Sequence, residues 1–190
     1  MDENSTLIFI TGGVRSGKTS FAEQLAAQFA EKEDLQLHYL ATGVVTDTEM
    51  RKRVERHQEI RANYQRQWKT VEQETNLHTL QQRFCKKDVV LFDCLTTLVS
   101  NELFLKEQAD WSKSFLESLK QEIAAAVIVL SKKCKYLIIV SNEVSYEPMQ
   151  TPLLIAYSWL LGNLHQTFVE IATEAYLVEN GLAIKKGWHI

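Results

Sequence analysis

Short apolar runs alternate with longer stretches of mixed character along the 190-residue chain. Five runs predict strands, at Leu7–Thr11, Leu37–Thr42, Val89–Asp93, Tyr136–Ser141 and Ala175–Val178. The stretches between them have helical spacing, at Ser20–Lys32, Thr48–Tyr64, Leu77–Phe84, Trp111–Lys132 and Leu153–Thr173. Unbroken apolar runs are typical of parallel strands buried on both faces. The pattern predicts an α/β fold with a doubly wound, mostly parallel sheet flanked by helices, and an edge strand within residues 182–190.

The composition fits one α/β domain over residues 1–190, because 45% hydrophobic residues supply a sizeable core and no linker or repeat is visible. A formal net charge of -3, with basic residues scattered among acidic ones, argues against nucleic acid as a partner. Three widely spaced cysteines fit reduced thiols better than disulfides or a metal site. The acidic start is unlike a secretion signal, and no apolar stretch is long enough to span a membrane. We therefore expect a cytoplasmic protein.

A phosphate-binding loop is predicted between the first strand and the first helix. The stretch fits G-x-x-x-x-G-K-[ST] and comprises Gly12, Gly13, Val14, Arg15, Ser16, Gly17, Lys18 and Thr19. Its glycines let successive N–H groups face phosphate oxygens, and the helix that follows adds its positive N-terminal end. Lys18 is predicted to reach the β- and γ-phosphates, and the Thr19 hydroxyl to bind Mg²⁺. A plain glycine turn is the alternative interpretation.

Asp93 follows four apolar residues of a predicted strand. P-loop proteins hold Mg²⁺ with a carboxylate at such a strand end, directly or through water. The alternative is an aspartate that caps the next helix, and both roles are compatible. Further along the chain from Trp68, Glu72 and Glu74 are interpreted from the residues alone as exposed acids at a strand edge.

A charged helix is predicted to follow the second strand, and it contains a candidate nucleophile. Arg53, His57 and Arg61 are four residues apart, so they share one helix face. Flanking arginines disfavour a charged imidazole, and a neutral imidazole is the form that attacks phosphorus. The same face can bind an anion. The alternative is a solvated helix face without a chemical role.

Taken together, these motifs make the chain resemble the bifunctional adenosylcobinamide kinase/adenosylcobinamide-phosphate guanylyltransferase family. The matching stretches are TGGVRSGKTSFAE, YLATG, DTEMRKRVERH, WKTVE, LFDCLTTLVSN and IVSNEV. They keep the family's order and cover nearly the whole chain. The resemblance implies a RecA-like P-loop NTPase fold, a homotrimer, Mg²⁺ as cofactor and GTP, with ATP as an alternative phosphate donor. The corrinoid substrates it implies are adenosylcobinamide and its phosphate.

The resemblance also assigns roles to individual residues. It implies that His57, which follows Arg56, carries the guanylyl group between GTP and the corrinoid phosphate. It implies nucleotide contacts by the phosphate-binding loop and by five further residues. These are Thr42, Gly43, Arg61, Glu72 and Asp93.

One segment departs from the family pattern. After SNEV the family continues with a glycine-rich stretch, then an arginine and an R-D pair, whereas this chain reads SYEPMQTPLLIAYSWLLGNLHQ. Tyr157, Ser158 and Trp159 stand where polar and charged residues are expected. Three alternatives therefore stay open: a guanylyltransferase that has lost the kinase step, a P-loop small-molecule kinase without a covalent histidine, and a nucleotide-binding switch.

Overall fold

The computed structural model describes residues 5–43, 48–64, 66–105, 111–143 and 151–186. Seven strands form one sheet in the order β3-β2-β4-β5-β1-β6-β7. All neighbouring pairs are parallel except β6 and β7, which form an antiparallel edge. The strands are β1 (Thr6–Gly12), β2 (Gln36–Ala41), β3 (Trp68–Glu72), β4 (Asp88–Asp93), β5 (Tyr136–Asn142), β6 (Glu174–Glu179) and β7 (Leu182–Lys186).

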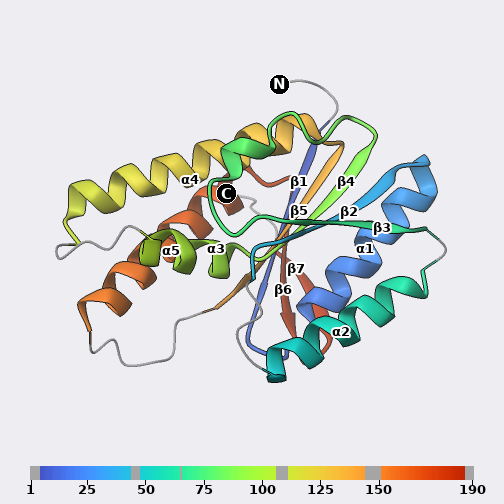
Figure 1. Cartoon of the computed structure of the whole chain (residues 1–190), viewed down its shortest axis with the longest axis horizontal. Helices are drawn as coiled ribbons and strands as arrows, with labels where there is room; N and C mark the ends of the chain where they lie inside the picture. Colours follow the sequence, from blue (N-terminus) through green and yellow to red (C-terminus); the bar gives the residue numbers. More distant parts are fainter. Residues whose placement is uncertain (1–4, 44–47, 65, 106–110, 144–150, 187–190) are drawn as a thin grey trace.

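Helices cover both faces of the sheet (Figure 1). The helices are α1 (Lys18–Glu33), α2 (Thr48–Ala62), α3 (Leu95–Leu105), α4 (Lys113–Lys133) and α5 (Pro152–Ile171), with a short 3₁₀ turn, η1, at Leu77–Leu80. Figure 1 shows α1 and α2 on one side of the sheet and α3, α4 and α5 on the other. The chain is therefore the mostly parallel α/β sheet that the pattern predicts.

Both faces of the central strands are buried, which explains their unbroken apolar runs. In β1, Ile8 and Ile10 belong to the core under α1, while Leu7 and Phe9 belong to the core under α3, α4 and α5. Burying each such side chain contributes about 1.5 to 3 kcal/mol. Alternate residues of one strand thus stabilise two separate layers.

Most predicted elements are confirmed, and three differ. The helix predicted at Leu77–Phe84 is only the 3₁₀ turn η1, because the chain turns after Leu80 and the Asp88 carboxylate binds the Cys85 N–H. Helix α3 was missed, since only Asp93 and Cys94 separate the apolar run of β4 from the apolar residues of this helix. Strand β3 was also missed, because Val71 is the one fully buried residue of this edge strand.

The carboxyl ends of the parallel strands meet at one edge of the sheet. Glu72 and Asp93 lie in one register row with Ala41 between them, and Gly12 pairs with Asn142 across β1 and β5. Ligands of open α/β sheets bind at this edge. In the described part of the chain, no helix combines the length and apolar character needed to cross a bilayer.

Candidate functional site

The phosphate-binding loop packs against the turn between β6 and β7. A Cβ atom at Gly12 would lie 2.3 Å from the Val178 carbonyl oxygen, so only glycine fits there. Gly17 caps α1 with a φ of 92°, a conformation that glycine adopts without strain. The Gly181 N–H donates to the Ser16 carbonyl oxygen at 2.9 Å. These contacts hold the loop at both ends.

The loop directs one cation inward and leaves its tip open. Val14 and Arg15 are exposed, whereas Lys18 is 8% exposed and its Nζ donates to the Gly13 carbonyl oxygen at 3.0 Å. Burial lowers the pKa of Lys18, and the nearby Asp93 carboxylate opposes that shift. The ammonium therefore lies inside the loop, where phosphate oxygens are expected.

Asp93 lies at the end of β4, close to the positive groups of the site. Its Oδ2 accepts a hydrogen bond from the Tyr39 hydroxyl at 2.7 Å. Burial raises the pKa of Asp93, while the Tyr39 hydrogen bond and the charges of His57 and Lys18 act in the opposite direction. Thr19 is half-buried in the first turn of α1. The structure thus brings His57 and Lys18 within electrostatic range of one buried carboxylate.

A second buried carboxylate joins α1 to α2. Glu23 has no exposed surface, and its Oε1 accepts a hydrogen bond from Arg61 at 2.9 Å. The same oxygen lies 3.4 Å from His57 Nδ1. The Arg61 guanidinium lies 3.8 Å from the centre of the Tyr39 ring. A continuous network therefore runs from His57 through Glu23, Arg61 and Tyr39 to Asp93.

The arginines predicted beside His57 have different environments. Arg61 is 5% exposed and pairs with Glu23, so its nucleotide contact stays a prediction. Arg56 is exposed. The Arg53 side chain lies outside the described residues.

The other predicted contacts lie along the same sheet edge. Thr42 is fully buried, and its hydroxyl both donates to the Cys94 carbonyl oxygen at 2.8 Å and accepts the Cys94 N–H at 2.9 Å. Gly43 directly follows it. Glu72 is exposed at the end of β3, in the same register row as Asp93. Thr42 thus supports the backbone after Asp93, and Glu72 lies open at the rim.

A neutral polar chain occupies the opposite face of the sheet, under α5. Ser141 Oγ lies 2.7 Å from His165 Nε2 and 3.1 Å from Thr96 Oγ1. Thr96 Oγ1 also accepts the Asn142 N–H at 2.7 Å. Burial lowers the pKa of His165 to about 4, and the ring packs edge-on against Phe9. This histidine is therefore neutral and holds the end of β5.

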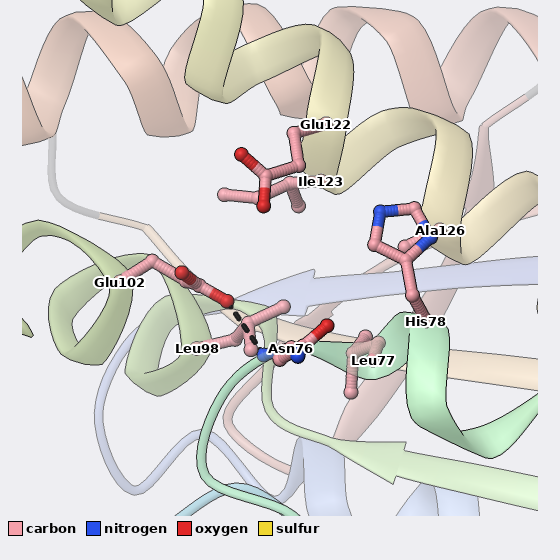
Figure 2. Close-up of a pocket in the computed structure, with 8 residues that line it drawn as sticks. All are labelled: Asn76, Leu77, His78, Leu98, Glu102, Glu122, Ile123 and Ala126. Atoms are coloured by element: carbon pink, nitrogen blue, oxygen red, sulfur yellow. Dashed lines mark hydrogen bonds between the residues drawn. The ribbon is translucent and has the colours of Figure 1, made fainter.

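Figure 2 shows a hollow between η1, α3 and α4. Leu98 and Ile123 line it from α3 and α4, and the Glu102 carboxylate accepts the Asn76 N–H at 2.7 Å. That bond fixes the start of η1. The residues that line the hollow include none of the predicted phosphate contacts, so we assign it a structural role.

Reasoning from the sequence missed Glu23 and Tyr39. Glu23 did carry a signal, because it lies on the helix face of Ala26, Ala27 and Ala30, all of which are buried. A lone carboxylate on a buried face needs a partner of opposite charge. Tyr39 carried none, since an aromatic residue within a strand is ordinary core material.

Comparison with known proteins gives one family. A family model described as "Cobinamide kinase / cobinamide phosphate guanyltransferase" matches residues 8–186. The "Bifunctional adenosylcobalamin biosynthesis protein CobU" of Escherichia coli (strain K12) is 30% identical over 186 residues, covering 94% of this chain and 98% of that protein. The protein of the same name from Salmonella typhimurium is 28% identical over the same coverage.

Solved structures add a distant likeness. A structure titled "Crystal structure of flagellar accessory protein FlaH from Methanocaldococcus jannaschii" covers 95% of this chain at 16% identity and a TM-score of 0.48. The match covers 75% of that protein.

Proposed function

The chain belongs to the cobinamide kinase / cobinamide phosphate guanyltransferase family, and from this premise we propose how its residues divide the two reactions. The first reaction phosphorylates adenosylcobinamide with GTP or ATP. The second transfers GMP from GTP to adenosylcobinamide phosphate through a guanylyl group on His57. The observation that carries the proposal is the position of His57, which contacts buried Glu23 within electrostatic range of Asp93 and Lys18.

The phosphate-binding loop holds the triphosphate in both reactions. Its backbone N–H groups and the Lys18 ammonium bind the phosphate oxygens, and the start of α1 adds its partial positive charge. The two activities therefore share one nucleotide site, and a change in Lys18 affects both.

Thr19 and Asp93 are the residues that would hold Mg²⁺. They fit the ion, since a hydroxyl and a carboxylate are the oxygen ligands that Mg²⁺ takes together with substrate phosphates. The raised pKa of buried Asp93 fits as well, because a cation at its carboxylate would offset the cost of burying that charge. When bound, Mg²⁺ neutralises charge on the phosphates.

His57 is the proposed nucleophile of the second reaction. A neutral ring nitrogen forms a bond to the α-phosphorus, and pyrophosphate leaves with the electrons of the broken P–O bond. An oxygen of the corrinoid phosphate then attacks the same phosphorus and releases the ring. Lys18 stabilises the charge that builds on the phosphates.

We propose that the kinase step depends on residues of α5, which lies on the face of the sheet opposite to α1 and α2. The family pattern has polar and charged residues at the positions of Tyr157, Ser158 and Trp159, but here Tyr157 and Trp159 are partly buried and pack against the core under α5. Residues 144–150, which replace the glycine-rich stretch, lie outside the described residues. We therefore propose a kinase step that is slower than guanylyl transfer.

Labelled GTP separates the alternatives. GTP labelled at the α-phosphate should leave label on the protein, while GTP labelled at the γ-phosphate should transfer label to adenosylcobinamide. A kinase without a covalent histidine would give only the second result, and a nucleotide switch would give neither.

The proposed homotrimer predicts a sedimentation mass of three chains of 21.9 kDa each. The proposed cytoplasmic location calls for fractionation of the source cells.

A further inference from the structure

Glu23 is a buried acid that the family motifs leave without a role. It lies on α1, one turn beyond the phosphate-binding loop, and it has no exposed surface. Its Oε1 lies 2.9 Å from Arg61 Nη1 and 3.4 Å from His57 Nδ1. The carboxylate therefore faces both the arginine and the proposed nucleophile.

Two polar atoms in this contact lack hydrogen-bond partners in the described part of the chain. They are Glu23 Oε2 and His57 Nδ1, both buried. A buried acceptor without a donor is costly, and so is a buried donor without an acceptor. A hydrogen bond from Nδ1–H to the Glu23 carboxylate, whose Oε1 lies 3.4 Å away, would give the ring nitrogen its missing partner.

We propose that Glu23 is a positioning residue that keeps the His57 proton on Nδ1 and so leaves Nε2 as the attacking atom. The inference rests on the proposed function only for what Nε2 attacks. The contact itself is given by the 3.4 Å distance between His57 Nδ1 and Glu23 Oε1. A hydrogen bond at one ring nitrogen determines which tautomer the imidazole adopts. His57 is 30% exposed at its side chain, so the ring is accessible from its other edge.

The carboxylate also matches the charge that the reaction creates. When the Nε2 lone pair forms the N–P bond, pyrophosphate leaves and the ring keeps its proton on Nδ1. The ring then carries a positive charge, which lies against the Glu23 carboxylate. Attack by the corrinoid phosphate breaks the N–P bond, returns the electron pair to Nε2 and restores the neutral ring.

Arg61 holds Glu23 in place for this role. Its guanidinium binds Oε1 and lies on the Tyr39 ring, so the arginine is fixed from two sides. The ion pair therefore keeps the Glu23 carboxylate in position beside the ring while His57 changes its charge.

The first test reads the tautomer directly. In protein labelled with ¹⁵N-histidine at neutral pH, the His57 signals, assigned with His57→Gln, should show Nδ1 protonated and Nε2 bare. Glu23→Gln should abolish this preference, because an amide can donate as well as accept. An Nε2-protonated ring in the wild-type protein, or an unchanged Nδ1–H form in Glu23→Gln, would overturn the proposal.

Two further variants keep the test valid if Glu23→Gln alone does not fold. Glu23→Gln leaves Arg61 buried without its partner, so the double variant Glu23→Gln/Arg61→Gln removes both charges together. Its His57 ring should show the same loss of tautomer preference. Arg61→Gln alone keeps the carboxylate and should keep the Nδ1–H form. Glu31→Gln, an exposed change on the same helix, is the matched control.

The rate of adduct formation is the functional readout. With saturating GTP, Glu23→Gln should slow guanylylation of His57 by about 10- to 100-fold and change the GTP affinity by less than about threefold. Glu23→Asp, which keeps a carboxylate, should recover part of the rate. Equal rates in Glu23→Gln and wild type would contradict the proposal. If the wild-type protein forms no adduct at all, the proposed function fails, while the tautomer still tests Glu23.

Discussion

Two histidines lie near the carboxyl ends of the strands, on opposite faces of the sheet, and their surroundings differ. His57 on α2 faces a carboxylate that an arginine also binds. His165 on α5 faces the Ser141 hydroxyl and the Phe9 ring, and burial lowers its pKa to about 4. One ring has a counter-charge beside it, and the other has none among the residues that the structure describes.

The difference shows which ring can take part in phosphorus chemistry. A histidine that forms a bond to phosphorus becomes positively charged, and a nearby carboxylate stabilises that charge. Around His165 the same charge would be buried without a partner. The α1–α2 side of the edge therefore fits the transfer chemistry, while the α5 side shapes the end of β5.

Lys18→Ala gives the largest expected effect, because guanylyl transfer and the kinase step both bind the triphosphate in the same loop. Guanylylation and corrinoid phosphorylation should each fall by about 10³-fold, since one buried cation at the phosphates is lost. Calorimetry should show weaker GTP binding by a folded variant. Unchanged GTP affinity would contradict the role given to the loop.

Asp93→Asn tests the acid at the centre of the charged side. Asparagine keeps the shape and can still accept from the Tyr39 hydroxyl, but it loses the charge that favours Mg²⁺. We expect activity to fall by about 100-fold, with a higher Mg²⁺ concentration needed for half-maximal rate. Asp34→Asn, at the exposed end of α1, should behave as wild type. An unaltered Mg²⁺ dependence in Asp93→Asn would exclude Asp93 as a metal ligand.

His165 predicts a pH-dependent stability. Its folded pKa of about 4 lies below the unfolded value near 6.5. Between about pH 6.5 and pH 4, His165 is protonated in the unfolded chain but neutral in the folded chain. Its contribution to stability is therefore complete above pH 6.5 and is lost as the pH falls toward 4. Allowing for partial exposure, the loss is on the order of 2 kcal/mol.

Urea unfolding at pH 7 and pH 4.5 measures this contribution. His165→Gln keeps a partner for the Ser141 hydroxyl but cannot titrate, so it should lose less stability than wild type between the two pH values. Identical losses in the two proteins would show that His165 is not the neutral buried group described above.

The smallest expected effect concerns the relative rates of the two reactions. Because Tyr157 and Trp159 are apolar and pack against the core where the family pattern has polar and charged residues, the kinase step should be about tenfold slower than guanylyl transfer. Initial rates with adenosylcobinamide and with its phosphate give the ratio. Equal rates would show that other residues replace the charged ones.

The fold could be predicted mainly where one physical cause dominates the pattern. Buried parallel strands such as β4 and β5 are apolar throughout, so their runs are unmistakable. Helix α3 could not be separated from β4 by hydrophobicity alone, because both are buried. Strand β3 pairs on one side only and presents a single buried residue, so its pattern was too weak.

The site could be predicted where a motif has a fixed spacing in sequence. The phosphate-binding loop and Asp93 each follow a strand, and the sheet edge brings them together. Glu23, Arg61 and Tyr39 come from three separate elements, and their contacts arise only when α1 and α2 pack on the sheet. Spacing along one helix placed Arg61 beside His57 but could not reveal its ion pair with Glu23.

Peptide mapping after treatment with α-labelled GTP and Mg²⁺ tests the central claim most directly. The label should be stable in alkali, be lost in acid as a phosphoramidate is, and map to His57. His57→Ala should abolish labelling and keep reversible GTP binding, whereas His165→Gln should still be labelled. Label on His38, His78, His165 or His189, or no label with GTP and Mg²⁺ present, would contradict the account.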